Sequence, residues 1–163
     1  MLSAPEPLAS HHQVDAFFSG EPSLDDWLKR RAKANQVSGA SRTFVASDAS
    51  GVVAYYSLAS SAIAVASVGG RFRRNMPDPI PVVVSARLAV ATSYQGRGIG
   101  RALFQDAARR VLHAAETIGI RGLLVHALST DVAEFYRRLG FDPSPLHPTI
   151  VMVTLADIRA SLE

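Results

Sequence analysis

Apolar and polar residues follow spacings along this chain that distinguish helices from strands. Between Gly98 and Ile118, apolar residues recur at intervals of three and four positions, which predicts a long helix that ends at Gly119. Between Val82 and Val90 nearly every residue is apolar, as expected for a strand covered on both faces. A buried strand followed directly by a long helix indicates a layered α/β arrangement.

Weaker patterns predict the remaining elements. Ser23 is expected to cap a helix that runs to about Asn35. The segment from Gly69 to Pro81 is rich in Gly, Pro and Arg and is therefore predicted to be a loop. Further strands are predicted at 43–46, 52–58, 123–128 and 150–155, and a short helix carries Val132, Phe135, Tyr136 and Leu139 on one side. No repeat or linker divides these elements, so we expect one α/β (α+β) domain over residues 1–163.

Composition limits the classes of function. The most apolar early stretch, Val52 to Val68, is interrupted by serine and tyrosine and is too short and polar for a membrane helix. The first residues lack the basic and then apolar layout of a signal peptide, so a cytoplasmic protein is expected. The chain has no cysteine, which excludes disulfides and zinc–thiolate sites. His11, His12, His113 and His147 have no spacing that indicates a metal site, so no metal is expected.

Basic residues are concentrated in two places although the net charge is only +3. One cluster lies between Lys29 and Lys33, and the other between Arg71 and Arg74. Such clusters can bind a polyanion by neutralising its phosphates. A solvated helix face and a basic loop would have the same composition, so charge alone leaves both interpretations open.

The most informative segment is the turn that joins the buried strand to the long helix. Its residues are Gln95, Gly96, Arg97, Gly98, Ile99, Gly100 and Arg101. Glycines allow a close approach of the backbone to a ligand, and the first turn of a helix offers unpaired N–H groups at the positive end of its dipole. The segment therefore predicts a pyrophosphate site, with Arg97 and Arg101 adding charge at its edge.

Two familiar nucleotide motifs do not fit this turn. The glycines alternate at 96, 98 and 100, which departs from the G-x-G-x-x-G pattern of dinucleotide-binding turns. The Gly-Lys-Ser or Gly-Lys-Thr of a nucleotide P-loop is absent. A tight strand-to-helix turn without a ligand remains open on spacing alone.

Two motifs in the chain resemble the signatures of the GNAT N-acetyltransferases. The segment from Gln95 to Gly100 resembles the coenzyme A loop of this family, and residues 135–141, Phe-Tyr-Arg-Arg-Leu-Gly-Phe, resemble its second signature. The resemblance spans roughly residues 40 to 155. It implies the GNAT fold, with a mixed central sheet of six to seven strands flanked by four to five helices, and acetyl-CoA as the donor without a metal.

The resemblance also assigns roles to individual residues. Coenzyme A would be bound by Leu88, Ala89 and Val90, which would pair with the pantetheine arm, and by Gln95, Gly96, Arg97, Gly98, Ile99, Gly100 and Arg101, whose amides would hold the pyrophosphate. A backbone N–H near Val90 could stabilise the oxyanion formed when an amine attacks the thioester. Tyr136 matches the position that often protonates the leaving thiolate. Without the resemblance, a tyrosine at this helical spacing is more often a core residue. His126, on a predicted strand, is a candidate base or a partly buried structural histidine.

A narrower resemblance covers almost the whole chain. Residues 22–28, 35–36, 39–45, 81–84, 87–90, 124–127 and 141–145 resemble the GNAT toxins of bacterial toxin–antitoxin pairs. It implies an enzyme that acetylates the α-amine of aminoacyl-tRNA and blocks translation, a ribbon-helix-helix antitoxin that neutralises it, and a homodimer. The basic residues would then form the tRNA-binding face: Lys29, Arg30, Lys33, Arg42, Arg71, Arg73 and Arg74.

The acceptor chemistry is compatible with this resemblance. The strand from Val82 to Ala91 has no Asp or Glu that could act as a general base, and relatives often carry Asp where Ala91 stands. An α-amine has a pKa of about 8, against about 10.4 for lysine, so more of it is already nucleophilic at cellular pH. Two alternatives stay open: acetylation of a small-molecule or protein amine, and a non-catalytic acyl-CoA-binding module.

Overall fold

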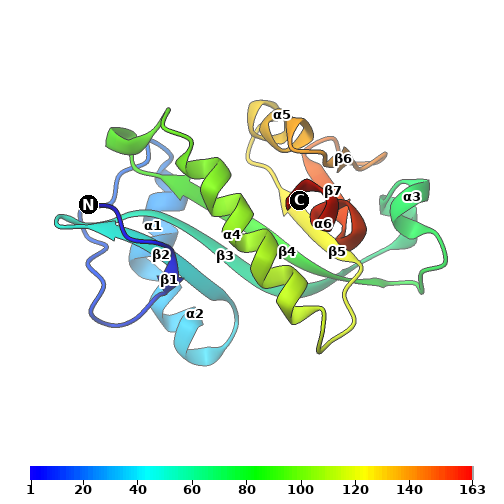
Figure 1. The fold of residues 1–163 in the computed structure, drawn as a ribbon, viewed down its shortest axis with the longest axis horizontal. Coiled ribbons are helices and arrows are strands. Elements are labelled where there is room, and N and C mark those ends of the chain that lie inside the picture. Colours follow the sequence, from blue (N-terminus) through cyan, green and yellow to red (C-terminus); the bar gives the residue numbers. More distant parts are fainter. Residues whose placement is uncertain (163) are drawn as a thin grey trace. The chain divides into compact units, whose positions relative to one another are not determined.

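The computed structural model describes residues 1–162 and contains a mixed sheet of seven strands in the order β1-β2-β3-β4-β5-β7-β6 (Figure 1). The neighbouring pairs β1–β2, β2–β3, β5–β7 and β6–β7 are antiparallel, whereas β4 and β5 are parallel. The predicted mixed sheet of six to seven strands is therefore confirmed. Among the described residues there are six α-helices where four to five were expected. The chain groups into two compact units, and the single domain over 1–163 stays a prediction.

The first unit comprises residues 1–59 and 87–107. Its elements are β1 (Glu6–Pro7), α1 (Pro22–Arg30), α2 (Ala32–Ser38), β2 (Arg42–Asp48), the first part of β3 (Gly51–Ile63), the end of β4 (Ile80–Val90), the 3-10 turn η2 (Thr92–Tyr94) and the start of α4 (Ile99–Ala114). In Figure 1, α1 and α2 lie on one side of β2 and β3, and α4 lies on the other.

Each side of this part of the sheet has its own apolar cluster. Leu24 and Leu28 of α1 pack with Tyr55 of β3 and Ala89 of β4. On the α4 side, Leu103 packs in a cluster with Tyr56, Leu88 and Val90. Side chains of β4 therefore alternate between the α1 side and the α4 side, as the period of a strand requires.

The start of α1 differs from the prediction. The N-cap residue is Glu21 rather than Ser23, and no side chain caps the helix. The buried Asp25 instead accepts hydrogen bonds from the backbone N–H of Ser19 at 3.0 Å and from its hydroxyl at 2.6 Å. The helix also ends at Arg30, because the backbone of Arg31 (φ −123°, ψ −33°) leaves helical geometry before α2 begins.

The second unit comprises residues 60–86 and those from 108 onward. It contains the 3-10 turn η1 (Val65–Ser67), α3 (Gly70–Arg73), most of β4, the end of α4, β5 (Gly122–His126), α5 (Thr130–Arg138), β6 (Asp142–Pro143), β7 (Ile150–Thr154) and α6 (Leu155–Leu162). Its core gathers Phe72, Ile80, Val82, Leu124 and Met152 with Val68. α3 lies in the segment predicted to be a loop, and it forms because Phe72 is buried in this core.

Three apolar or aromatic side chains of the second unit are more exposed than predicted. Ile118 and Val132 were placed on buried helix faces but are 54 % and 38 % exposed. Ile118 lies beyond the end of α4 at Ala114, so the helical period no longer directs it inward. His126, expected to be partly buried, is exposed at the end of β5. No helix within residues 1–162 is both long and apolar enough to cross a membrane.

Candidate active site

The backbone is fixed by neighbouring strands and loops before the glycine-rich turn begins. After β4 ends at Val90, the N–H of Ala91 donates to the carbonyl of Val53 at 2.8 Å. The N–H of Thr92 donates to the carbonyl of Phe18 at 2.9 Å. Ala91 is buried in the α1-side cluster, and its methyl group offers no polar atom to a ligand.

Gln95 anchors the turn through its side chain. Its amide nitrogen donates to the carbonyl of Val90 at 2.9 Å and to that of Ser19 at 2.8 Å. Its backbone N–H donates to the carbonyl of Thr92 at 3.3 Å. Because that N–H is already bonded, the open amides of the turn begin at the next residue, Gly96.

From Gly96 to Arg101 the backbone amides are available to a ligand. Within the described residues none of them donates to a protein acceptor, whereas the N–H of Ala102 bonds to the carbonyl of Gly98 at 3.1 Å. Gly96 and Gly98 both have φ of +78°, and a Cβ added to either would meet nothing within 4 Å. These glycines are thus required by backbone conformation and border open space. Successive open amides at the positive end of the 16-residue α4 are chemically suited to bind an anion.

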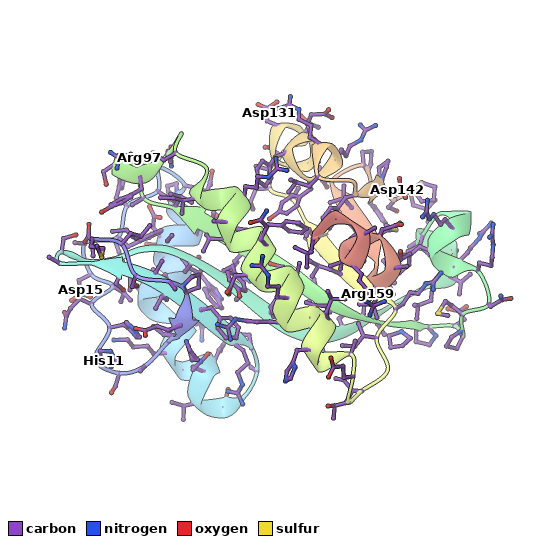
Figure 2. All side chains as sticks on the ribbon, viewed as in Figure 1. His11, Asp15, Arg97, Asp131, Asp142 and Arg159 are labelled. Carbon is purple, nitrogen blue, oxygen red and sulfur yellow. The ribbon has the colours of Figure 1, made fainter. Side chains whose placement is uncertain are left out.

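A tyrosine and a carboxylate hold the start of the turn to the β2–β3 hairpin. The hydroxyl of Tyr94 donates to Asp48 at 2.6 Å, and Asp48 also accepts from the hydroxyl of Ser50 at 2.5 Å. Hydrogen bonds from Ser50 and then Tyr94 lower the pKa of Asp48 to about 2, and the bond to Asp48 raises the pKa of Tyr94. Figure 2 labels Arg97, which lies in the turn that precedes α4. Its guanidinium carbon is 5.1 Å from the centre of the Tyr94 ring. The bond between Tyr94 and Asp48 could not be predicted from the sequence, because the two residues are 46 positions apart.

Tyr136 lies on α5 in the second unit. Its side chain is 3 % exposed and packs edge-on against Phe135 and Phe141, with ring centres 5.1 and 5.2 Å away. Ser129 caps α5 by accepting from the N–H of Val132 at 3.2 Å, which fixes the helix that carries the tyrosine. Burial raises the pKa of Tyr136, so its hydroxyl stays protonated through the physiological range and can act as a donor.

The basic residues of the first unit fall into two groups. Lys33 donates to the carbonyls of Ser10 and His12 at 3.2 and 2.8 Å, and Arg42 donates to the carbonyl of Gln36 at 2.6 Å. Lys29 and Arg30 are exposed in the last turn of α1, and neither has an ion pair within the described chain. The latter two cations are therefore available to an external anion.

The basic residues of the second unit also divide into one that is bonded within the protein and two that are not. Arg71 forms an ion pair with Asp157 at 2.5 Å. Arg73 and Arg74 are exposed, and neither makes an ion pair or side-chain hydrogen bond with another described residue.

Histidines near the N-terminus form a cluster that the sequence did not predict. Possible ligand atoms of Glu6, His11 and His12 lie within 4.8 Å of one another. His12 already uses both ring nitrogens: Nδ1 accepts from the N–H of Ala9 at 2.8 Å, and Nε2 lies 2.7 Å from Glu6. With Nδ1 as an acceptor, the proton of neutral His12 is on Nε2 and is donated to Glu6. Both ring nitrogens of His12 are thus bonded within the protein.

Known proteins share this arrangement of sequence and fold. The family model of the acetyltransferase (GNAT) domain matches residues 39–143, a range that includes both the turn and the segment around Tyr136. A tRNA-acetylating toxin of Mycobacterium tuberculosis is 48% identical over 158 residues, covering 97% of this chain and 95% of its own. A probable toxin TacT of Sinorhizobium fredii is 29% identical over 167 residues, covering 95% of this chain and 92% of its own.

Solved structures agree over the whole chain. AtaT complexed with acetyl-methionyl-tRNAfMet superimposes with a TM-score of 0.90 at 26% identity, and each chain is covered completely (100%). A tyrosine-to-phenylalanine mutant of KacT gives a TM-score of 0.90 at 26% identity, with 98% of each chain covered. The family model spans both the open amides at the start of α4 and the buried tyrosine of the second motif. The chain therefore belongs to the GNAT acetyltransferase family.

Proposed function

We propose that this enzyme transfers the acetyl group of acetyl-CoA to the α-amine of an aminoacyl-tRNA, and that it thereby acts as a toxin that blocks translation. The observation that carries the proposal is the 48% identity, over almost the whole of both chains, to a tRNA-acetylating toxin. The likeness to AtaT in complex with acetyl-methionyl-tRNAfMet supports the same acceptor, because the molecule bound there is an N-acetylated aminoacyl-tRNA. Such a substrate places the activity in the cytoplasm.

On the donor side, the amides from Gly96 to Arg101 would bind the pyrophosphate of acetyl-CoA. Their availability in the described chain and the positive end of α4 support this role. The exposed guanidinium groups of Arg97 and Arg101 would add charge at the edge of the cradle. The backbone of Leu88, Ala89 and Val90 would pair with the pantetheine arm. Acetyl-CoA bound to AtaT–AtaR is consistent with this donor.

The chemistry would proceed by direct attack. A neutral α-amine adds to the thioester carbonyl, and a backbone N–H near Val90 stabilises the oxyanion. The attacking amine passes its proton to solvent water as the C–S bond breaks. The departing thiolate of coenzyme A accepts a proton from the hydroxyl of Tyr136, which regains one from solvent. The hydroxyl of Tyr136, whose pKa is raised by burial, is protonated at neutral pH and can therefore donate to the thiolate. No carboxylate general base is needed for an amine whose pKa is about 8.

On the acceptor side, the phosphates of tRNA would meet the seven basic residues predicted from the sequence. Lys29, Arg30, Arg73 and Arg74, which have no ion pair within residues 1–162, would make the principal contacts. Lys33, Arg42 and Arg71 are already bonded within the protein and would contribute mainly through their charge.

A ribbon-helix-helix antitoxin and a homodimer complete the proposal. AtaT bound to the C-terminus of its antitoxin AtaR, and an AtaT–AtaR complex bound to DNA, support a partner that binds both toxin and DNA. Stable co-purification with the product of the neighbouring gene, and rescue of growth by it, would test the partner. Light scattering at micromolar concentration would test the dimer.

The proposed reaction is tested directly with radiolabelled acetyl-CoA and total charged tRNA. We expect label in the RNA fraction, no label with deacylated tRNA, and a rate reduced by about 100-fold or more in Tyr136→Phe. Absence of label from an enzyme that still binds acetyl-CoA would reject aminoacyl-tRNA as the acceptor and point to a small-molecule or protein amine. Toxicity retained in a Tyr136→Phe protein that has lost transfer would instead favour a non-catalytic acyl-CoA-binding module.

A further inference from the structure

Three side chains of the first unit form a column that the predicted site does not include. The guanidinium carbon of Arg87, on β4, lies 4.5 Å from the centre of the Trp27 ring of α1. Trp27 stacks on Tyr55 of β3 with a centre-to-centre distance of 6.0 Å and an angle of 12° between the rings. Tyr55 is fully buried, and its hydroxyl donates to the carbonyl of Leu24 at 2.7 Å. The column therefore rests on the core and ends in a cation.

The cation at the end of the column has unused hydrogen-bond donors. Within residues 1–162, the half-buried Arg87 side chain lies over the face of Trp27 and near Tyr55, and it makes no hydrogen bond or ion pair. Arg121, by contrast, donates to the carbonyls of Phe72 and Arg71 at 2.8 and 2.9 Å. Stacking on an aromatic ring uses the face of a guanidinium and leaves its edge, with five N–H groups, available. Partial burial of the Arg87 guanidinium costs free energy when no acceptor bonds to it. An anionic ligand that accepts its N–H groups would offset this cost.

Arg87 is also placed at a suitable distance from the proposed reaction centre. It precedes Leu88 on β4, and the three residues to Val90 span about 10 Å of extended strand. Because side chains alternate along a strand, Arg87 shares the α1 side with Ala89, whereas Leu88 and Val90 pack on the α4 side. The pyrophosphate cradle is at the start of α4. A phosphate bound by Arg87 would therefore lie on the α1 side of the sheet rather than at the start of α4.

We propose that Arg87, held by Trp27, binds the phosphate of the 3′-terminal nucleotide of the aminoacyl-tRNA and so positions the amine at the thioester. In an aminoacyl-tRNA this phosphate is one ribose away from the aminoacyl ester, so it accompanies the amine into the site. Arg87 is a binding and positioning residue, and its role rests on the proposed function. The two available phosphate sources, the RNA terminus and coenzyme A, are distinguished by the experiment.

The kinetic test compares Arg87→Met with Arg87→Lys and with Arg109→Met, a control at an exposed position on α4. For Arg87→Met we expect the KM for charged tRNA to rise roughly tenfold or more while the KM for acetyl-CoA is unchanged. The slope of log(kcat/KM) against log[salt] should become less steep by about 0.7–0.9, the value of one phosphate contact. Arg87→Lys should keep the slope and still raise KM several-fold, because lysine cannot bind through the same planar edge.

A spectroscopic arm reports on the column itself, because Trp27 is the only tryptophan of the chain. Titration of the wild-type protein with charged tRNA should change its fluorescence, titration with acetyl-CoA should not, and Arg87→Met should lose the tRNA response.

A rise in the KM for acetyl-CoA alone would assign the phosphate to coenzyme A and overturn the proposal. An unchanged salt slope with a lower melting temperature would reduce Arg87 to a structural role. If the wild type does not label charged tRNA at all, the proposed function fails; if it does and Arg87→Met is unaltered, only this inference fails.

Discussion

Two segments of this protein have nearly the same composition and different structures. The turn from Gln95 to Arg101 and the segment from Gly69 to Arg74 are both rich in glycine and arginine, and each leads into a helix. In the first, Gly96 and Gly98 take positive φ and the amides that follow are open. In the second, Gly69 has φ of −72°, the helix has four residues, and Phe72 is buried. Backbone conformation, rather than composition, therefore distinguishes the two segments.

The anchoring of the two segments differs as well. The turn is held at its start by side chains, Gln95 on two carbonyls and Tyr94 on Asp48, which leaves its later residues exposed. The second segment is held along its length: Arg71 pairs with Asp157, and its carbonyl accepts from Arg121. A loop anchored only at its entrance can present its backbone to a ligand. A loop bonded to the protein along its length instead packs against the core and has less backbone open to a ligand.

Replacing both positive-φ glycines should have the largest effect. In Gly96→Ala/Gly98→Ala, each alanine would have to adopt the left-handed region at about 1–2 kcal/mol. We expect the exposed turn to relax out of this conformation, so that the Kd for acetyl-CoA, measured by calorimetry, rises about 100-fold while the melting temperature changes little. The matched control is Gly69→Ala/Gly70→Ala, where neither residue has positive φ and an added Cβ meets nothing within 4 Å. An equal Kd for acetyl-CoA in the two double variants would show that the positive-φ glycines are not needed for binding.

Removal of the Gln95 side chain should have the next largest effect. Gln95→Ala loses two hydrogen bonds to carbonyls, each worth about 1 kcal/mol, so the turn samples other conformations before it binds. We expect the KM for acetyl-CoA to rise roughly tenfold. Gln105→Ala, on α4, is the control, because the Gln105 side chain makes no hydrogen bond within residues 1–162. An affinity equal to that of the control would show that the backbone holds the turn without this anchor.

Local patterns in the sequence predicted the parts of the site that depend on near neighbours. Glycine spacing after a buried strand identified the turn, and the helical period identified α4, because both signals lie within a few residues. The same rules misplaced the N-cap of α1 and the exposed Ile118. They also missed α3, since one buried phenylalanine in a glycine- and arginine-rich segment leaves no period to detect.

Contacts between distant positions could not be predicted in this way. Tyr94 and Asp48 are 46 residues apart, and Gln95 and Ser19 are 76 apart, so no periodicity connects them. Gln95 was identified as a binding residue through its backbone, whereas the structure uses its side chain as an anchor. The column of Arg87, Trp27 and Tyr55 likewise joins residues that are distant in the sequence, from β4, α1 and β3. Side chains that fix a site from outside its motif become visible only in the fold.

The two segments should also differ in how their arginines respond to RNA. Arg73→Ala/Arg74→Ala removes two cations without an ion pair in the described chain, so we expect the KM for charged tRNA to rise several-fold and the salt slope to fall by about 1.5. Arg71→Ala should have a smaller effect on the slope because Asp157 already neutralises that cation. Asp157→Asn, which releases Arg71, should steepen the slope. Identical slopes for all three variants would place the RNA elsewhere.

The smallest expected effect concerns the carboxylate at the entrance of the turn. Folding lowers the pKa of Asp48 to about 2 from about 3.9 in an unfolded chain, because Ser50 and Tyr94 donate to the charged form. The resulting stabilisation is therefore complete above about pH 4 and is lost as the pH falls toward 2. We expect Asp48→Asn to melt at a lower temperature than the wild type at neutral pH, and the difference to shrink between pH 4 and 2.

Asp15→Asn is the control for this titration, because Asp15 is exposed and has no recorded hydrogen bond within residues 1–162 (Figure 2). Its melting curves should follow those of the wild type at every pH. If the Asp48→Asn curves also ran parallel to the wild type between pH 4 and 2, the carboxylate would not hold the hydroxyl of Tyr94 in solution. The entrance of the turn would then be fixed by Gln95 alone, and the contrast with the segment from Gly69 to Arg74 would depend on a single side chain.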